Sequence, residues 1–88
     1  MIIKSIKIEP DAIIKIFDKH NVLQEEIYDA LKNDAPRFKN VGGNQYAAIG
    51  LSRSRYLTIF FRYDNGEAEI TTAYPSDKGQ ITTYKKMK

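Results

Sequence analysis

The dipeptide Asn65-Gly66 constrains the fold of this chain more than any other sequence feature. It separates YLTIFFRY (56–63) from EAEITTAY (67–74), two segments in which polar and apolar residues alternate as in a β-strand. Asn-Gly favours a two-residue turn of type I′, so the two segments are predicted to form a hairpin. The turn fixes the register of the core face as Tyr63 opposite Ala68, Phe61 opposite Ile70, Ile59 opposite Thr72, and Leu57 opposite Tyr74.

Two helices are expected between residues 10 and 36. Pro10 suits the first turn of the first helix, in which Ile13, Ile14 and Phe17 share one face at helical spacing. Asn21 is expected to cap the second helix, with Gln24 in the capping-box position. The buried stripe of the second helix is then predicted to consist of Leu23, Ile27, Ala30 and Leu31.

The other predicted elements are short. Residues 2–9 alternate loosely and predict an N-terminal strand, and residues 45–51 predict a strand that follows a polar loop ending in Gly42-Gly43-Asn44. Asp77 begins a short C-terminal helix with Gln80 as its capping partner. The order of strand, two helices, three-strand antiparallel meander and short helix predicts one small α+β domain over residues 1–88.

Composition excludes several classes of function. The chain has no cysteine, so disulfides and thiolate metal sites are excluded, and one histidine with scattered carboxylates predicts no metal site. No apolar run approaches the roughly 18 residues that a membrane span needs. The N-terminal residues are too short a stretch, and too interrupted by lysines, for a signal peptide. We therefore expect a cytoplasmic protein that uses no metal or other cofactor.

The charge is distributed unevenly along the chain. Residues 1–36 carry five Lys/Arg and seven Asp/Glu (5 − 7 = −2), whereas residues 37–88 carry nine and four (9 − 4 = +5), which together give the net charge of +3. A basic surface on one side is typical of a protein with a polyanionic partner such as RNA. A solvated lysine-rich face gives the same pattern, and charge alone leaves both interpretations open.

Three stretches, DKHNVLQEEIYDAL, QYAAIGLSRSRYLTIFFRY and EITTAYPSDKGQITTY, share their order and spacing with motifs of a known family. In this respect the chain resembles the RelE/ParE toxin superfamily, and most closely its BrnT-like branch, over roughly residues 10–84. The resemblance implies a RelE/ParE-like fold and the toxin of a bacterial toxin–antitoxin pair. Such toxins usually cleave RNA without a metal, and a partner antitoxin neutralises them. Members of the ParE branch inhibit DNA gyrase instead, so the fold does not by itself select the activity.

The chain departs from the family pattern at three positions. Tyr74 stands where the family usually has arginine after the alanine, and Gln80 stands where it usually has glutamate. Asn21 replaces the usual glycine after Lys19-His20. A non-catalytic module on the same fold, which binds nucleic acid or a partner protein, is therefore an alternative to an RNA-cleaving enzyme.

Metal-free RNA cleavage needs a base, an acid and positively charged donors near the phosphate. Histidine changes its charge near neutral pH, which makes His20 the candidate acid or base, although a surface or capping histidine gives the same signal. Arg55 and Tyr84 match family positions and complete the predicted catalytic set of His20, Arg55 and Tyr84. The predicted RNA-binding residues are Lys19, Arg37, Lys39, Arg53, Tyr74, Lys85 and Lys86.

Each of these residues also has a structural interpretation. SRSR (52–55) can be a solvated polar turn, and the C-terminal lysines can form a frayed basic tail. The register above places Tyr74 on the core face, which predicts partial burial. Phe38, between Arg37 and Lys39, is expected in a loop, where it either stacks on a base or packs against the core.

Overall fold

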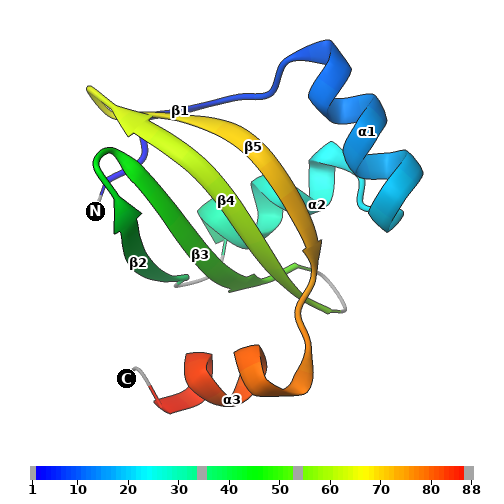
Figure 1. The fold of residues 1–88 in the computed structure, drawn as a ribbon, viewed down its shortest axis with the longest axis vertical. Coiled ribbons are helices and arrows are strands. Elements are labelled where there is room, and N and C mark those ends of the chain that lie inside the picture. The colour runs from blue at the N-terminus through cyan, green and yellow to red at the C-terminus, as the bar shows by residue number, and fades with distance from the viewer. Residues whose placement is uncertain (1, 34–35, 53–54, 87–88) are drawn as a thin grey trace.

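A computed structural model describes residues 2–33, 36–52 and 55–86 of the chain. Its helices and strands follow the order β1 (Ser5–Lys7), α1 (Pro10–His20), α2 (Gln24–Tyr28), a π-helical turn η1 (Asp29–Asn33), β2 (Arg37–Gly42), β3 (Gln45–Leu51), β4 (Tyr56–Asp64), β5 (Glu67–Pro75) and α3 (Lys78–Lys86). The predicted α+β class is confirmed, with a twisted sheet in front of α2 and with α3 at one end (Figure 1).

The sheet contains five strands, one more than the predicted N-terminal strand and three-strand meander together. Its order is β1-β5-β4-β3-β2, in which β2 to β5 are antiparallel neighbours and β1 lies parallel to β5. Residues 37–42 were predicted as loop, and they form the edge strand β2 instead. Charged residues are common on edge strands, because they discourage pairing with another chain. The charged residues of β2 made the segment look like a loop in the sequence. Phe38 points to the core side and meets the Phe61 ring edge-on, with 6.1 Å between ring centroids.

The Asn65-Gly66 turn joins β4 and β5 as predicted, with positive φ angles of 50° and 84° at the two residues. Two predicted pairs beside the turn are confirmed, namely Tyr63 with Ala68 and Phe61 with Ile70, and Arg62 pairs with Glu69 between them. The hairpin therefore has the expected register near its turn, where the turn geometry controls it.

Further from the turn, the predicted register is wrong by one residue. A β-bulge leaves Thr71 without an opposite residue, and its hydroxyl donates a hydrogen bond to the Phe60 carbonyl at 3.0 Å. Beyond it, Ile59 pairs with Ala73 rather than Thr72, and Leu57 pairs with Pro75 rather than Tyr74. Because side chains alternate along a strand, this shift moves Tyr74 from the predicted core face to the other face of the sheet.

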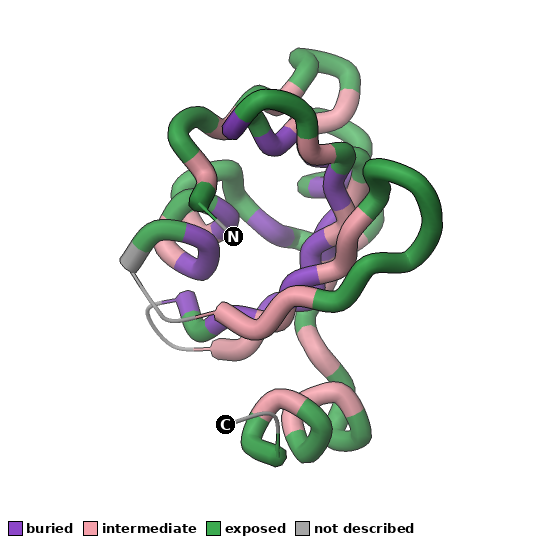
Figure 2. The backbone as a smooth tube through the Cα atoms, turned by 90° about the vertical axis from the view of Figure 1, so that its left-hand side faces the viewer, coloured by how far each residue is buried: buried purple, intermediate pink, exposed green. Residues whose placement is uncertain are grey.

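The hydrophobic core lies between one face of the sheet and the helices, where Figure 2 shows the buried residues gathered. The buried residues of the helices and of the junction between α1 and α2 include Ile16, Val22, Ile27, Ala30 and Leu31. The predicted stripe of the second helix is thus confirmed except at Leu23, which is 46% exposed. Gly50 permits this packing, since a Cβ atom at that position would collide with the Ala30 carbonyl oxygen.

The junction between α1 and α2 differs from the prediction. Asn21 does not cap the second helix: it ends α1 in the left-handed conformation (φ 55°, ψ 39°), and its N–H donates to the Phe17 carbonyl at 2.8 Å. Among residues with a side chain, asparagine tolerates this conformation best, which explains how Asn21 replaces a glycine. The N-cap of α2 is Leu23, whose N–H donates to the Glu26 carboxylate at 3.4 Å.

Candidate functional site

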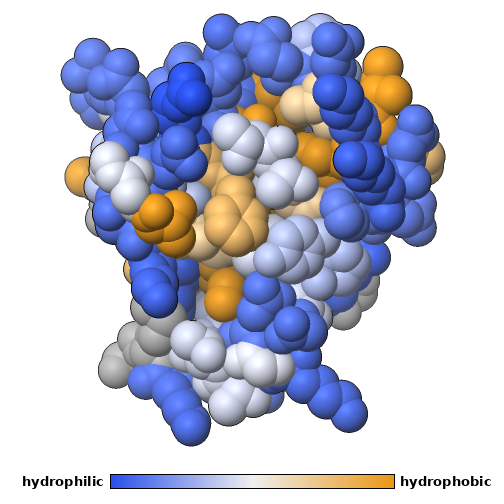
Figure 3. Space-filling model, viewed as in Figure 1, coloured by the Kyte–Doolittle hydropathy of each residue, from blue (hydrophilic) through white to orange (hydrophobic). Residues whose placement is uncertain are grey.

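The sheet has a second face, opposite the core, which we call the outer face. Two cross-strand rows define it: Arg37, Ile49, Thr58 and Tyr74 form the first, and Lys39, Ala47, Phe60 and Thr72 form the second. Figure 3 looks onto this face and shows apolar side chains at its centre with hydrophilic residues around them. Three strand spacings separate Arg37 from Tyr74, which places their backbones about 14 Å apart.

His20 lies at the end of the first row. It is the last residue of α1, and its ring faces that of Tyr74 with 5.7 Å between centroids and 49° between the ring planes. Tyr74 also lies next to Phe60, at 6.1 Å between ring centroids. The bulge at Thr71 is therefore what brings the tyrosine to the only histidine of the sequence.

The start of α3 is attached to the same tyrosine. Gln80 Nε2 donates to the Tyr74 hydroxyl oxygen at 3.0 Å, so the tyrosine keeps its own proton for another acceptor. The predicted capping partnership of Asp77 and Gln80 is confirmed: the Gln80 N–H donates to Asp77 Oδ1 at 2.8 Å, and the Asp77 N–H donates to Gln80 Oε1 at 3.0 Å. Gln80 thus starts the helix and orients Tyr74 with one amide group.

The end of α3 meets the opposite side of the outer face. The Tyr84 ring contacts the Tyr56 ring at 5.2 Å between centroids, and the Arg37 guanidinium lies over Tyr84 at 5.5 Å from the ring centroid. A guanidinium at this distance from an aromatic ring makes a cation–π contact. Lys85 and Lys86 follow in the exposed last turn.

A cleft between α1 and β5 adjoins His20. Lys15, Lys19 and His20 of α1 line it together with Thr71 and Thr72 of β5, and Glu9, Asp11, Ala12 and Ile16 complete its lining. His20 therefore stands between this cleft and the outer face, where Lys19 can offer an ammonium group to a ligand that reaches the imidazole.

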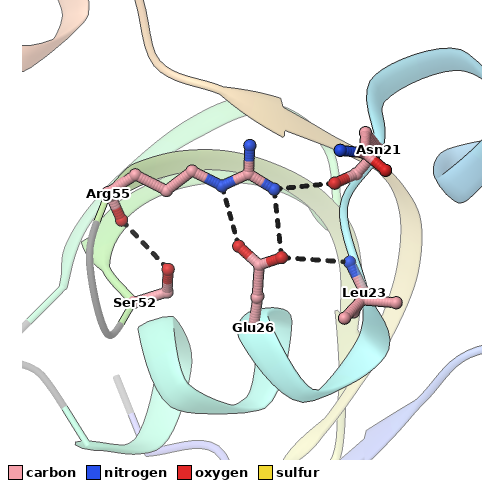
Figure 4. A network of polar contacts seen from close by, with 5 residues as sticks. All are labelled: Asn21, Leu23, Glu26, Ser52 and Arg55. Carbon is pink, nitrogen blue, oxygen red and sulfur yellow. Dashed lines mark hydrogen bonds and ion pairs between the residues drawn. The ribbon is translucent and has the colours of Figure 1, made fainter.

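Arg55 is engaged away from the outer face (Figure 4). Its Nε donates to Glu26 Oε2 at 2.8 Å, and its Nη2 donates to Glu26 Oε1 at 3.0 Å and to the Asn21 carbonyl at 2.7 Å. The Ser52 hydroxyl donates to the Arg55 carbonyl at 3.1 Å. This fork of charged hydrogen bonds holds the α1–α2 junction against the start of β4.

The ion pair changes the titration of both partners. The hydrogen bond from Arg55, more than its charge, lowers the pKa of Glu26 below the ordinary value of 4.5, although partial burial opposes this. The same hydrogen bond raises the pKa of Arg55. Because the side chains of Arg55 and Glu26 are only 33% and 21% exposed, water screens this pair less than a surface ion pair.

The structure gathers most of the predicted site residues. His20, Tyr74, Arg37 and Tyr84 lie around one end of the outer face, Lys39 belongs to its second row, and Lys19 lines the adjoining cleft. Lys85 and Lys86 are exposed beyond them, Arg55 lies apart, and Arg53 is outside the described residues. The predicted catalytic and RNA-binding roles of these residues stay predictions.

Two aromatic residues of this face were not predicted as site residues. Tyr56 and Phe60 belong to the strand YLTIFFRY, whose alternation puts Leu57, Ile59 and Phe61 in the core. The same alternation therefore indicates that Tyr56 and Phe60 point to the outer face, and this signal was available in the sequence. The described residues include no cluster of three or more His, Asp or Glu side chains that could hold a metal ion, and no described helix is long and apolar enough to span a membrane.

No protein-family model and no curated protein matches this sequence. Among solved structures, the fold is similar to the 1.1 Å crystal structure of the Brucella abortus ribonuclease toxin BrnT, with a TM-score of 0.70. The superposition covers 84% of this chain and 97% of that one, at 10% sequence identity. The chain therefore has the BrnT fold that its motifs predicted.

Proposed function

We propose that this BrnT-fold domain is a metal-independent ribonuclease that acts as the toxin of a bacterial toxin–antitoxin pair, with RNA and an antitoxin as partners. The observation that carries the proposal is the contact of His20 with Tyr74 at one end of a cross-strand row that has Arg37 at the other. The likeness to a ribonuclease toxin supports it at the level of the fold. Aromatic rings between basic residues are typical of surfaces that bind single-stranded RNA.

In this proposal His20 is the general base. Its imidazole takes the proton of a 2′-hydroxyl as the 2′-oxygen attacks the adjacent phosphorus and the bond from phosphorus to the 5′-oxygen breaks. Tyr74 returns a proton to the 5′-oxygen, and the Gln80 amide stabilises the phenolate that remains. The products are a 2′,3′-cyclic phosphate and a 5′-hydroxyl. Lys19 neutralises charge on the phosphate from the adjoining cleft.

Arg37, Lys39 and α3 bind the RNA strand beside the cleaved bond. Arg37 and Lys39 contact phosphates from β2, and Phe60 and Tyr84 supply rings on which bases stack. Lys85, Lys86 and Arg53 add phosphate affinity. Arg55 has a positioning role here, because it holds the carbonyl of Asn21, the residue that directly follows His20.

The test is cleavage of an end-labelled single-stranded RNA by the purified protein in the presence of a metal chelator. We expect His20→Ala to reduce cleavage by about 100-fold or more and Tyr74→Phe by about tenfold or more. Tyr63→Phe removes a hydroxyl outside the site and is the matched control. Induced expression should arrest growth with the wild type and not with His20→Ala. Cleavage that His20→Ala leaves unchanged contradicts the proposal.

One observation favours the alternative of a module that binds RNA without cleaving it. Gln80 supplies an amide where the family usually has glutamate, so no carboxylate stands beside Tyr74 at that position. In this alternative the wild type and His20→Ala bind RNA equally, neither cleaves it, and expression leaves growth unchanged. A DNA supercoiling assay separates the ribonuclease and the binding module from a gyrase-inhibiting toxin.

A further inference from the structure

Helix α1 is apolar on two sides, of which only one packs in the core. Ile16 is 3% exposed and faces the sheet. The predicted apolar face of Ile13, Ile14 and Phe17 lies elsewhere on the helix, with Ile14 59% and Phe17 46% exposed. Figure 3 shows strongly apolar side chains at the outer margin of the α1 region. The regular apolar stripe in the sequence therefore does not serve the core of this domain.

The stripe forms one wall of a groove between α1 and the start of α2. Ile13, Ile14 and Phe17 line the first wall, and Val22 and Leu23 continue the apolar lining. Leu23 is 46% exposed, whereas Val22 is 1% exposed and closes the groove toward the core. The left-handed Asn21 and the Arg55 hydrogen bond to its carbonyl fix the angle between the walls. The shape of the groove is therefore set by the backbone of the α1–α2 junction and not only by side-chain rotamers.

The polar residues that line this groove are acidic or neutral. Asp18, Gln24 and Glu25 complete the lining, and no lysine or arginine occurs among the described residues that line it. The outer face of the sheet carries Arg37 and Lys39 instead. The groove and the outer face therefore suit partners of opposite charge.

We propose that this groove binds an amphipathic helix of a partner protein, with apolar residues at helical spacing and lysine or arginine residues beside them. Helix α1 forms the first wall, and its backbone groups from Ile13 onward are paired within the helix, so this wall offers no edge to which a strand could be added. The apolar face of such a helix fits the apolar lining of the groove, and its basic flanks lie beside the acidic residues Asp18 and Glu25.

Other occupants fit less well. A symmetric dimer through this groove would bring Asp18 and Glu25 of each copy toward the same residues of the other, which like charge disfavours. RNA is repelled by the same carboxylates. None of the residues assigned above to RNA binding or cleavage lines the groove, so this proposal does not rest on the ribonuclease activity.

The probe is a synthetic helical peptide of about four turns, with leucine at helical spacing and lysine on both flanks. A matched peptide carries glutamate in place of each lysine, and fluorescence anisotropy measures binding of both. The net charge of +3 makes unspecific attraction of the lysine peptide to this protein weak. We expect the lysine peptide to bind at least about tenfold more tightly than the glutamate peptide.

Variants locate the binding site. Phe17→Ser and Leu23→Ser should each weaken binding by about tenfold, whereas Val41→Ser, at a 48% exposed apolar position on β2, should leave it unchanged. The pair Asp18→Lys with Glu25→Lys should reverse the preference between the two peptides. These positions are on the surface, and circular dichroism confirms the fold of each variant.

Three results of the peptide assays overturn the proposal: no binding of the lysine peptide, equal binding of the two peptides, or a weakening by Val41→Ser equal to that by Phe17→Ser. A concentration-dependent dimer that Phe17→Ser dissociates, seen by sedimentation, identifies a second copy as the occupant and also overturns it.

Discussion

The α1–α2 junction and helix α3 flank the same site, but they are attached to the sheet by different means. At the junction, Arg55 makes three charged hydrogen bonds to Glu26 and Asn21, and Ile16 and Val22 are buried beside them. None of the residues of α3, all of which the structure describes, is buried, and Figure 2 shows the helix standing apart from the core. Its attachment includes the Gln80 hydrogen bond and the contacts of Tyr84.

This difference assigns different mechanical roles to the two regions. In the proposed function His20 is the catalytic base and must keep its geometry, and it ends the helix that the junction fixes. The proposed role of α3 in binding RNA gains from a weaker attachment, because the helix can adjust when a strand binds. The comparison therefore predicts that substitutions at the junction change global stability, whereas substitutions in α3 change local opening.

The largest effect is expected for Arg55→Ala. The substitution leaves the Glu26 carboxylate and the Asn21 carbonyl without their donor in a partly buried place, which should lower the free energy of unfolding by about 2–3 kcal/mol. Urea denaturation measures it. Arg62→Ala is the matched control, because Arg62 is exposed and lies opposite Glu69, and it should cost less than about 1 kcal/mol. Equal losses in the two variants would remove the distinction between the junction and an ordinary surface pair.

Low pH should reduce the stability that the Arg55–Glu26 pair contributes to the same junction. Arg55 lowers the pKa of Glu26, so the folded state keeps the carboxylate ionised at pH values where the unfolded chain protonates it. The resulting stability is fully present above the ordinary value of 4.5 and is lost as the pH falls through the lowered pKa. Glu26→Gln should therefore lower stability at pH 7, and its difference from the wild type should narrow below about pH 4. A difference that stays constant down to pH 2 would show that the charge of Glu26 has no part in the junction.

The sequence predicted the elements other than β2 well, because these depend on local patterns. The Asn65-Gly66 turn and the Asp77/Gln80 cap are set by neighbouring residues, and both are confirmed. The Arg55–Glu26 pair joins residues 29 positions apart, and no local pattern indicates it. The bulge at Thr71 has no sequence signal either, since threonine suits a regular strand equally well.

The bulge had the greatest consequence for the site. Prediction of a regular hairpin placed Tyr74 on the core face, and a single extra residue moves it to the outer face beside His20. The exposed stripe of α1 has a similar origin, because periodicity identifies an apolar face but does not say whether the same chain covers it. The sequence therefore predicted which residues belong to the candidate site, whereas their positions relative to one another depended on the register between strands.

A smaller effect is expected for Gln80→Ala. This variant removes the cap partner of Asp77 and the donor to Tyr74, so α3 should open locally while the core stays intact. Hydrogen exchange should accelerate by about tenfold in α3 and remain unchanged in β3 and β4, with a global loss of about 1 kcal/mol or less. Lys78→Ala, at an exposed position of the same helix, is the control. Equal acceleration in the core strands would show that α3 unfolds together with the domain.

The smallest change in stability, and the sharpest test of the site, is expected for Gln80→Glu. A glutamate still accepts the Asp77 N–H, and a carboxylate in the first turn of a helix is favourable, so stability should change by less than about 0.5 kcal/mol. The side chain can no longer donate to Tyr74, and instead accepts the tyrosine proton. If Tyr74 is the acid of RNA cleavage, this carboxylate competes for its proton and slows the reaction while RNA affinity stays the same. If the chain is a binding module whose chemistry was lost with the family's glutamate, the same variant gains cleavage, and single-turnover assays on one RNA separate the two outcomes.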